Sequence, residues 1–188
     1  MNNMKERIRR KLHTCQGFTL AETLLAVLIM LLVSTIVATG IPAAKNAYEK
    51  VVLASNAQVL LSTTISTLRN ELGTAMDVET PDNEAGENKH SVITYYNASR
   101  GAFSKLYVES KDNKIMFQRY FSKDGMGTTQ TDSQLISSKT ATGDLYVTYS
   151  NVEKTGTIVT FYGLSVKRGS GTDSLASRDE LSIRVISE

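Results

Sequence analysis

The chain contains little cysteine, histidine or net charge, and each shortage excludes a class of protein. One of its 188 residues is cysteine, Cys15, so no intramolecular disulfide can form and a small secreted fold held by disulfides is excluded. Lys and Arg number 21 against 19 Asp and Glu, and a net charge of +2 disfavours a strongly basic nucleic-acid binder. His90 has no companion His or Cys at metal-ligand spacing, so we expect it at the surface.

Sequence motifs for catalysis are missing as well. The chain has no Gly-x-Ser-x-Gly elbow, no His-Glu-x-x-His pair and no glycine-rich phosphate loop with a lysine. Several carboxylates are present, but no pair is singled out by its spacing. We therefore expect a protein that is not an enzyme and that needs neither a cofactor nor a metal.

The charge that the chain does carry is unevenly placed. The first 17 residues have five basic residues against Glu6 alone, namely Lys5, Arg7, Arg9, Arg10 and Lys11. The whole chain carries +2 and this segment +4, so the remainder carries −2. An uncharged run of 18 residues follows from Leu24 to Ile41, about 27 Å long as a helix. It is long enough to span a bilayer, and the basic flank predicts a cytoplasmic N-terminus and an extracytoplasmic C-terminal part.

Three kinds of N-terminus fit this pattern: a cleaved secretory signal, a plain signal anchor and a prepilin-type leader. The apolar run is longer than a secretory signal needs, although Pro42-Ala43-Ala44 imitates a small-residue cleavage site. Glu22 favours the third kind, because a carboxylate at the start of a spanning helix is costly and is usually retained where it has a partner. Snorkelling of Glu22 to the headgroups is the alternative.

The segment Gly17-Phe18-Thr19-Leu20-Ala21-Glu22, with its basic flank and apolar sequel, resembles the type IV prepilin and pseudopilin family. The resemblance covers about residues 12–41. It implies that prepilin peptidase cuts after Gly17 and that the new N-terminal residue, Phe18, is methylated. It also implies that Glu22 serves assembly, by pairing with the α-amine of a neighbouring subunit, a use for which buried polar pairs are suited.

The resemblance further implies partners and a location. The chain would enter the cell membrane as a single-pass protein, with its head outside, and would then join a pilus or pseudopilus at the cell surface. Its partners would be prepilin peptidase, other pilin or pseudopilin subunits, the inner-membrane platform protein and the assembly ATPase. Adhesion or twitching, competence and type II secretion all remain open as destinations, and the sizeable head without a disulfide favours a minor subunit. The rival is a signal-anchored extracytoplasmic binding module that never polymerises.

A second helical segment follows the apolar run. Gly40 and Pro42 predict a kink or local melting, because proline removes a helix hydrogen bond and disfavours helix at the residue before it. Apolar residues recur at helical spacing from Ala44 to Leu72, and Gly73 predicts the helix end. The sequence therefore predicts one helix from Phe18 to Leu72, whose stripe from Tyr48 onward packs on a sheet.

The rest of the chain is predicted to be an acidic loop followed by strands. Carboxylates crowd residues 74–90, where a solvated loop is favoured over a calcium site. β-Branched and aromatic residues predict the strands Ser91–Tyr96, Phe103–Glu109, Lys114–Phe121, Asp144–Tyr149, Thr157–Lys167 and Leu181–Ile186. We expect a pilin-like α+β fold, a long helix packed on an antiparallel sheet, divided into residues 1–17 (leader), 18–41 (transmembrane half of the helix), 42–73 (amphipathic half), 74–90 (acidic loop) and 91–188 (β-rich head).

Nucleic acid is an unlikely partner on charge grounds. Lys167 and Arg168 begin a small basic loop that ends at Gly171, as a competence pseudopilin in contact with DNA would require. Two cations neutralise few phosphates, and salt-sensitive affinity grows with that number. Binding to DNA therefore stays an alternative.

Overall fold

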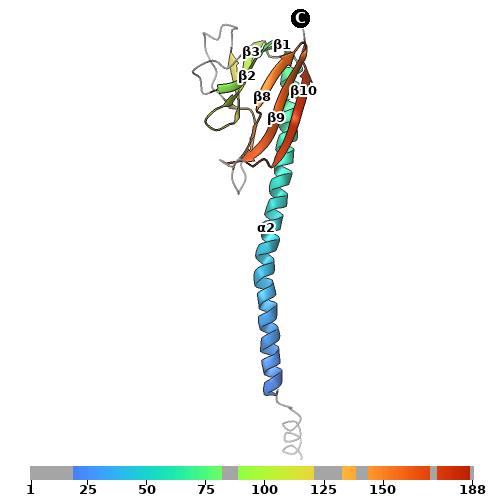
Figure 1. Ribbon diagram of the computed structural model, residues 1–188, viewed down its shortest axis with the longest axis vertical. Coiled ribbons are helices and arrows are strands. Elements are labelled where there is room, and N and C mark those ends of the chain that lie inside the picture. Colours follow the sequence, from blue (N-terminus) through green and yellow to red (C-terminus); the bar gives the residue numbers. More distant parts are fainter. Residues whose placement is uncertain (1–18, 82–88, 121–132, 139–143, 170–172, 187–188) are drawn as a thin grey trace, which may run out of the picture. The chain divides into compact units, whose positions relative to one another are not determined.

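The computed structural model describes residues 19–81, 89–120, 133–138, 144–169 and 173–186. The chain divides into two compact units, Met1–Lys50 and Val51–Glu188. A single helix, α2 (Leu20–Leu72), begins in the first unit and ends in the second, and the rest of the described chain forms antiparallel strands and their connections (Figure 1). The predicted α+β class, a long N-terminal helix packed on antiparallel sheets, is confirmed.

Helix α2 ends where its sequence predicts. Gly73 follows the last helical residue, and its backbone N–H donates to the carbonyl of Arg69 at 2.8 Å. A Cβ at position 73 would lie 2.7 Å from that same oxygen, a contact that only glycine avoids. The predicted end of the helix at Leu72 is therefore confirmed.

Only the last third of α2 is buried. Its buried side chains recur every three or four residues and form one stripe: Ala57, Leu60, Thr64, Leu68, Glu71 and Leu72. Tyr48 and Val51, which the sequence placed on this stripe, are exposed, so that part of the prediction is wrong. Their spacing is helical, but the strands of the head meet α2 further along, from about Leu53 onward.

The first sheet is a meander in which each strand pairs with the next. Its order is β1 (Ala75–Glu79), β2 (Lys89–Asn97), β3 (Ala102–Glu109), β4 (Ile115–Tyr120) and β5 (Ser133–Gln134). A turn joins β3 to β4. Asn113 adopts a φ of 52° there, which asparagine tolerates better than most residues, and its N–H donates to the Glu109 carbonyl at 2.7 Å.

The second sheet has the order β10 (Ala176–Arg184), β9 (Ile158–Arg168), β7 (Leu145–Thr148) and β6 (Ser137–Ser138), and β8 (Asn151–Thr155) also pairs with β9. The register shows that β7 and β8 are two parts of one strand, since Thr148 opposes Ser165 and Asn151 opposes Tyr162. The ladder is interrupted opposite Gly163, whose φ is 63°. Ser150 lies against this glycine, so the two backbones approach closely at that point.

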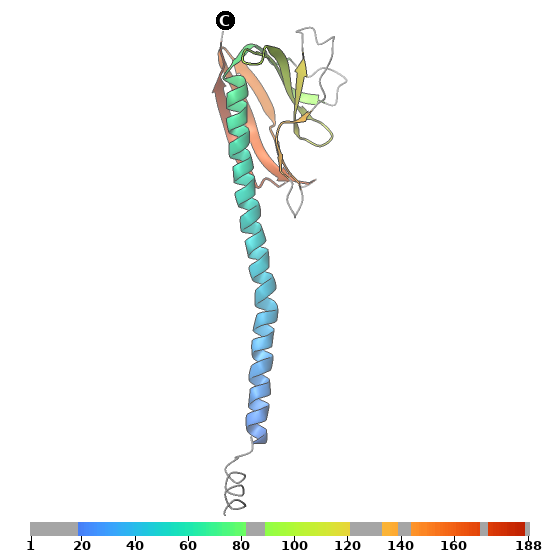
Figure 2. The same cartoon turned by 180° about the vertical axis from the view of Figure 1, so that it is seen from behind.

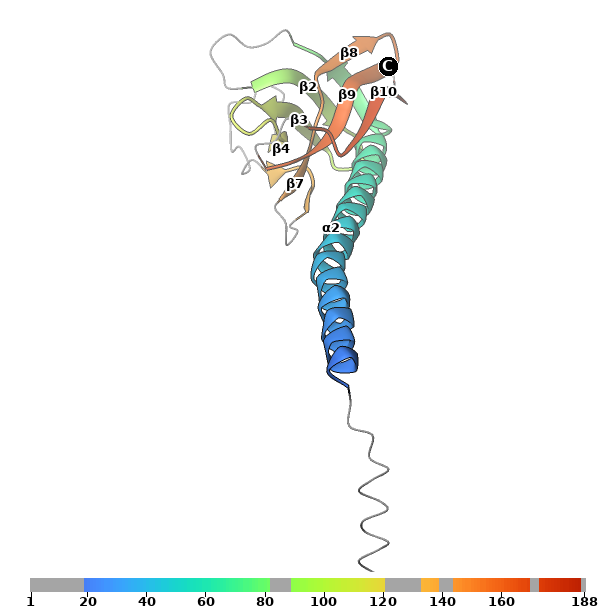
Figure 3. The ribbon, with the colours of Figure 1, turned by 60° about the horizontal axis from the view of Figure 1, so that its bottom comes forward.

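The two sheets and the end of α2 share one apolar core. In the head, the helix lies alongside β9 and β10, and the first sheet stands beside the second (Figures 2 and 3). Leu68 and Leu72 of the helix belong to the same cluster as Ile93, Leu106 and Phe161 of the strands. Leu181, Ile183 and Val185 are all buried in it, whereas Ser182 and Arg184 between them are exposed.

The range 74–90, predicted to be a loop, is corrected in part. Strand β1 occupies Ala75–Glu79, and β2 already begins at Lys89, so His90 lies on a strand. The sequence of this strand shows no clear strand pattern, because Asp77 and Glu79 are charged and only Ala75 and Val78 are buried. Asp82, Glu84 and Glu87 lie outside the described residues. The strand Asn151–Thr155, with Val152 as its only buried residue, was missed for the same reason.

Candidate assembly and membrane segment

The first turn of α2 is closed by hydrogen bonds between Thr19 and Glu22. The backbone N–H of Thr19 donates to Glu22 Oε2 at 3.0 Å, and the Thr19 hydroxyl donates to the same oxygen at 3.2 Å. The N–H of Glu22 returns to Thr19 Oγ1 at 3.3 Å. This reciprocal pattern is a capping box, which satisfies two backbone donors that the helix leaves free and places a negative charge at the positive end of the helix dipole.

The capping box gives Glu22 a role that sequence reasoning missed. Its signal, Thr19-x-x-Glu22 before an apolar run, is visible in the sequence. Both hydrogen bonds that the carboxylate accepts from Thr19 are made by Oε2, and within the described residues Glu22 is exposed. Gly17 and Phe18, the predicted processing and methylation positions, lie outside the described residues, so their roles stay predictions.

The apolar surface of α2 after Glu22 is uncovered. From Leu24 to Ile41 the large apolar side chains are between 50% and 74% exposed, and Leu28 and Met30 are examples. By length and composition the helix can cross a membrane. A soluble domain rarely exposes such a contiguous apolar surface, so this segment requires an apolar environment or a partner.

The hydroxyl groups of this segment bond back to the helix. Ser34 donates to the Met30 carbonyl at 2.7 Å, and Thr35 donates to the Leu32 carbonyl at 2.7 Å. Thr39 lies within bonding distance of the Thr35 carbonyl, at 3.0 Å. Because their hydrogen-bonding capacity is used within the helix, these polar residues are compatible with a lipid environment.

The predicted helix break at Gly40 and Pro42 is only partly tested. The helix is unbroken through both residues, so the predicted melting is wrong for this single chain. Proline removes one hydrogen-bond donor, and the turns on either side keep theirs. The kink at this point stays a prediction.

A buried polar cluster fixes the other end of α2 to the first sheet. Glu71 Oε1 and Oε2 pair with the Arg100 guanidinium at 2.6 Å and 3.0 Å, and the Asn97 side-chain amide donates to Oε2 at 3.1 Å. The Glu71 side chain is 10% exposed and that of Arg100 is 40% exposed, so water reaches one end of the pair. The Arg100 guanidinium carbon also lies 6.0 Å from the ring centroid of Phe117. The cluster sets the rotation of the helix on the sheet.

Tyr95 and Tyr149 are two of the buried tyrosines of this head, and burial raises the pKa of both side chains. The pKa of Tyr149 is raised by desolvation alone, and its hydroxyl donates to the Ser91 carbonyl at 2.6 Å. The pKa of Tyr95 is raised mainly by burial and further by the nearby Glu71 carboxylate. The Tyr95 hydroxyl is buried without a hydrogen-bond partner among the described residues. Both side chains belong to the apolar core of the head.

The other candidate binding residues from the sequence do not form a common site among the described residues. Lys167 and Arg168 end strand β9, half-buried and exposed respectively, and the rest of that basic loop lies largely outside the described residues. Within the part of the chain that the structure describes, no group of three or more His, Cys, Asp or Glu side chains is placed to hold a metal. The calcium alternative therefore gains no support from Asp77 and Glu79.

No model of a protein family, no curated protein sequence and no solved structure matches this chain.

Proposed function

We propose that this protein is a structural subunit, a minor pilin or pseudopilin, of a type IV pilus-like filament. The observation that carries the proposal is the first part of α2, an uncovered apolar helix with one carboxylate in its first turn, which continues into a folded head. A filament whose subunits pack their N-terminal helices together would cover this surface. The fold is then pilin-like, and the protein has no catalytic activity of its own.

The capping box bears on how Glu22 would act in assembly. After cleavage behind Gly17, the α-amine of Phe18 is a free cation, and among apolar helices it needs an anion. In the described chain Oε2 of Glu22 accepts two bonds from Thr19. The other oxygen, Oε1, is left for the amine of a neighbouring subunit. Thr19 would hold the carboxylate in position, and Glu22 would make the contact between subunits.

The remaining steps follow from the family resemblance. The chain would be held in the cell membrane with its leader inside and its head outside, cut by prepilin peptidase and methylated on Phe18. A platform protein and an ATPase would then extract it into the filament. Whether the filament serves adhesion, DNA uptake or secretion is set by the head and its partners, and no described residue singles out one of these.

The test separates processing from assembly. Wild type, Glu22→Ala and Glu22→Gln are expressed with the pilus machinery, and the N-terminus of the membrane-extracted protein is determined by mass spectrometry. All three should begin at Phe18, methylated, and both variants should be lost from sheared filaments. Glu49→Gln, which neutralises a carboxylate on the same helix outside the uncharged run, is the control and should assemble normally. Filament yields from Glu22→Gln equal to wild type would contradict the proposed role of the carboxylate.

A signal-anchored module that never polymerises is the second candidate. The capping box favours it, because a local role at the helix start accounts for Glu22 without any neighbour. In that case the isolated protein would begin at Met1, or near Ala43 if the segment were a cleaved signal. Either N-terminus would reject the pilin proposal.

A further inference from the structure

The outer end of the apolar segment is marked by two residues that differ from everything before them. After Glu22, the first charged residue is Lys45, and after Phe18 the first aromatic residue is Tyr48. The 22 residues between Glu22 and Lys45 carry no charge. The uncharged part of the helix therefore has a charged residue at each end, with an aromatic residue close to each.

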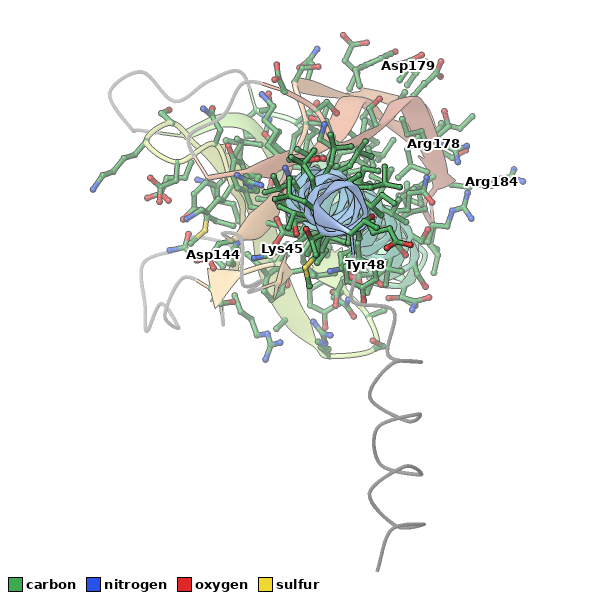
Figure 4. All side chains as sticks on the ribbon, turned by 90° about the horizontal axis from the view of Figure 1, so that it is seen from below. Lys45, Tyr48, Asp144, Arg178, Asp179 and Arg184 are labelled. Carbon is green, nitrogen blue, oxygen red and sulfur yellow. The ribbon has the colours of Figure 1, made fainter. Side chains whose placement is uncertain are left out.

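Lys45 and Tyr48 lie on the same face of α2, because residues three apart are neighbours on a helix. Both project from the helix (Figure 4), and Tyr48 is 71% exposed. The Lys45 side chain is 74% exposed, and its ammonium lies 3.8 Å from the Glu49 carboxylate. Within the first unit, neither side chain packs on a core. An exposed tyrosine beside a lysine at the end of an apolar helix is typical of a membrane–water interface.

The length between the two charged ends matches a bilayer. At 1.5 Å per residue, 22 residues span about 33 Å, close to the roughly 30 Å of the hydrocarbon core. Placing the boundary at Ile41, as the sequence suggested, would leave the uncharged residues Ala43 and Ala44 and the ring of Tyr48 in water. A boundary at Lys45 places Pro42 in the outer leaflet, where a proline within a continuous helix is tolerated.

We propose that Lys45 and Tyr48 form a lipid-headgroup contact that fixes the outer membrane boundary of α2 before assembly. The Lys45 ammonium pairs with lipid phosphates, and the Tyr48 ring lies at headgroup level with its hydroxyl toward water. This inference rests on the proposed insertion of the helix in a membrane, not on filament formation. A second copy of the chain is the other conceivable occupant of this face. Lipid is favoured because the long, hydrated Lys45 side chain is costly to bury against another helix and free to reach phosphates.

The absence of tryptophan makes the test direct, because one substitution introduces the only indole in the chain. The full chain is reconstituted in vesicles of phosphatidylethanolamine and phosphatidylglycerol as Tyr48→Trp, with Ile41→Trp and Val52→Trp as controls on either side. Quenching is measured with bromine at the middle of the acyl chains, with a spin label on the headgroup, and with aqueous iodide. Ile41→Trp should respond most to bromine, Tyr48→Trp to the headgroup label and Val52→Trp to iodide.

A further variant tests Lys45 itself. Lys45→Leu lengthens the uncharged run, so in the Tyr48→Trp background it should shift quenching from the headgroup label toward the acyl bromine. Lys50→Leu, which changes the same kind of residue on another face, should leave the pattern unchanged. Both measurements read depth in the membrane and do not depend on assembly.

Three quenching results would overturn the proposed contact of Lys45 and Tyr48 with lipid headgroups. Tyr48→Trp quenched by iodide as strongly as Val52→Trp would place the boundary before Lys45 and overturn the inference while leaving insertion intact. Shielding of position 48 from all three quenchers, with cross-linked dimers through Tyr48→Cys in a Cys15→Ser background, would assign this face to a second copy and also overturn it. Iodide quenching at all three positions would reject insertion in a membrane, and with it the proposed function. The filament yields of the Glu22 variants do not affect the interpretation of these quenching measurements.

Discussion

Leu28 and Leu68 lie on the same unbroken helix, and the first is 52% exposed whereas the second is 0% exposed. Helical conformation is therefore the same in both regions of α2, and the difference comes from what surrounds it. Around Leu68 the strands of both sheets supply the apolar contacts. Around Leu28 the protein supplies none among the described residues, and lipid or other subunits would have to. Helical conformation therefore does not tell whether a side chain faces protein, lipid or water, and the exposed fraction of the side chain is needed to decide.

The largest effect expected from this comparison is on Leu68. Leu68→Ala should lower the free energy of unfolding of the head by about 3 kcal/mol, because it removes buried methyl groups and leaves a cavity. Leu28→Ala, the same change in the exposed region, should alter it by less than about 0.5 kcal/mol. Both are measured by guanidinium unfolding of the full chain in detergent micelles. Tyrosine fluorescence reports on the head, since every tyrosine except Tyr48 lies there. Equal losses would show that the two regions are not independent.

Gly163→Ala should have the next largest effect and lower the free energy of unfolding by about 2 kcal/mol. A Cβ there would lie 2.6 Å from Ser150 Oγ, and the φ of 63° strains any other residue. Gly156→Ala is the matched control, since its φ is 60° but nothing lies within 4 Å of the added carbon, so it should lose about 1 kcal/mol for the backbone alone. Adding Ser150→Ala should recover part of the loss at Gly163. No recovery would mean that the close approach is not what requires glycine.

Arg100→Ala should lower the free energy of unfolding by between about 1 and 2 kcal/mol. It leaves the Glu71 carboxylate buried with the hydrogen bond from the Asn97 amide, but the exposure of the arginine reduces the loss below that of a fully buried pair. Arg100→Lys should lose most of the same energy, because an ammonium cannot make both contacts at once. Urea unfolding of the same micellar protein measures each variant. Full stability of Arg100→Lys would show that charge alone is sufficient.

The smallest effects concern the hydroxyl groups of Tyr95 and Tyr149. Tyr149→Phe should cost about 1 kcal/mol, because it removes the hydrogen bond to Ser91, whereas Tyr95→Phe should be neutral or stabilising, since its hydroxyl has no partner among the described residues. A similar loss in both would show that the Tyr95 hydroxyl does have a partner.

The same tyrosines predict a dependence on alkaline pH. Their folded-state pKa values are raised, so the stability they contribute is complete below the unfolded pKa of about 10 and falls above it. Each should contribute a loss of about 1.4 kcal/mol per pH unit, which the matching phenylalanine variant removes. Unfolding curves at several pH values on either side of 10 measure both slopes.

Much of the fold was predictable, and the misses have a common cause. Strands β2, β3, β4, β7 and β9 were predicted because β-branched and aromatic residues fill them, and the helix end because Gly73 follows Leu72. Strands β1 and β8 were missed because both are short, each contains two charged residues, and few of their side chains are buried. They form strands because β1 pairs with β2 and β8 pairs with β9. The residues of β1 and β8 alone do not reveal this pairing.

The candidate site divides in the same way. Glu22 was singled out because a lone carboxylate beside an apolar run is visible in the sequence, and its role in assembly stays a prediction. Its partner Thr19 was overlooked, although four residues contain the whole signal. Glu71 and Arg100 are 29 residues apart, and nothing in either neighbourhood predicts their pairing.

The sequence by itself determined the uncharged run, its charged ends, the helical periodicity and the absence of catalytic motifs, because each of these depends on residues close together in the chain. Only the tertiary structure decided how far the head extends along α2, why Tyr48 is exposed while Leu68 is buried, and which charged residues meet. Burial depends on segments far apart in the chain that pack together, and such contacts leave no local pattern.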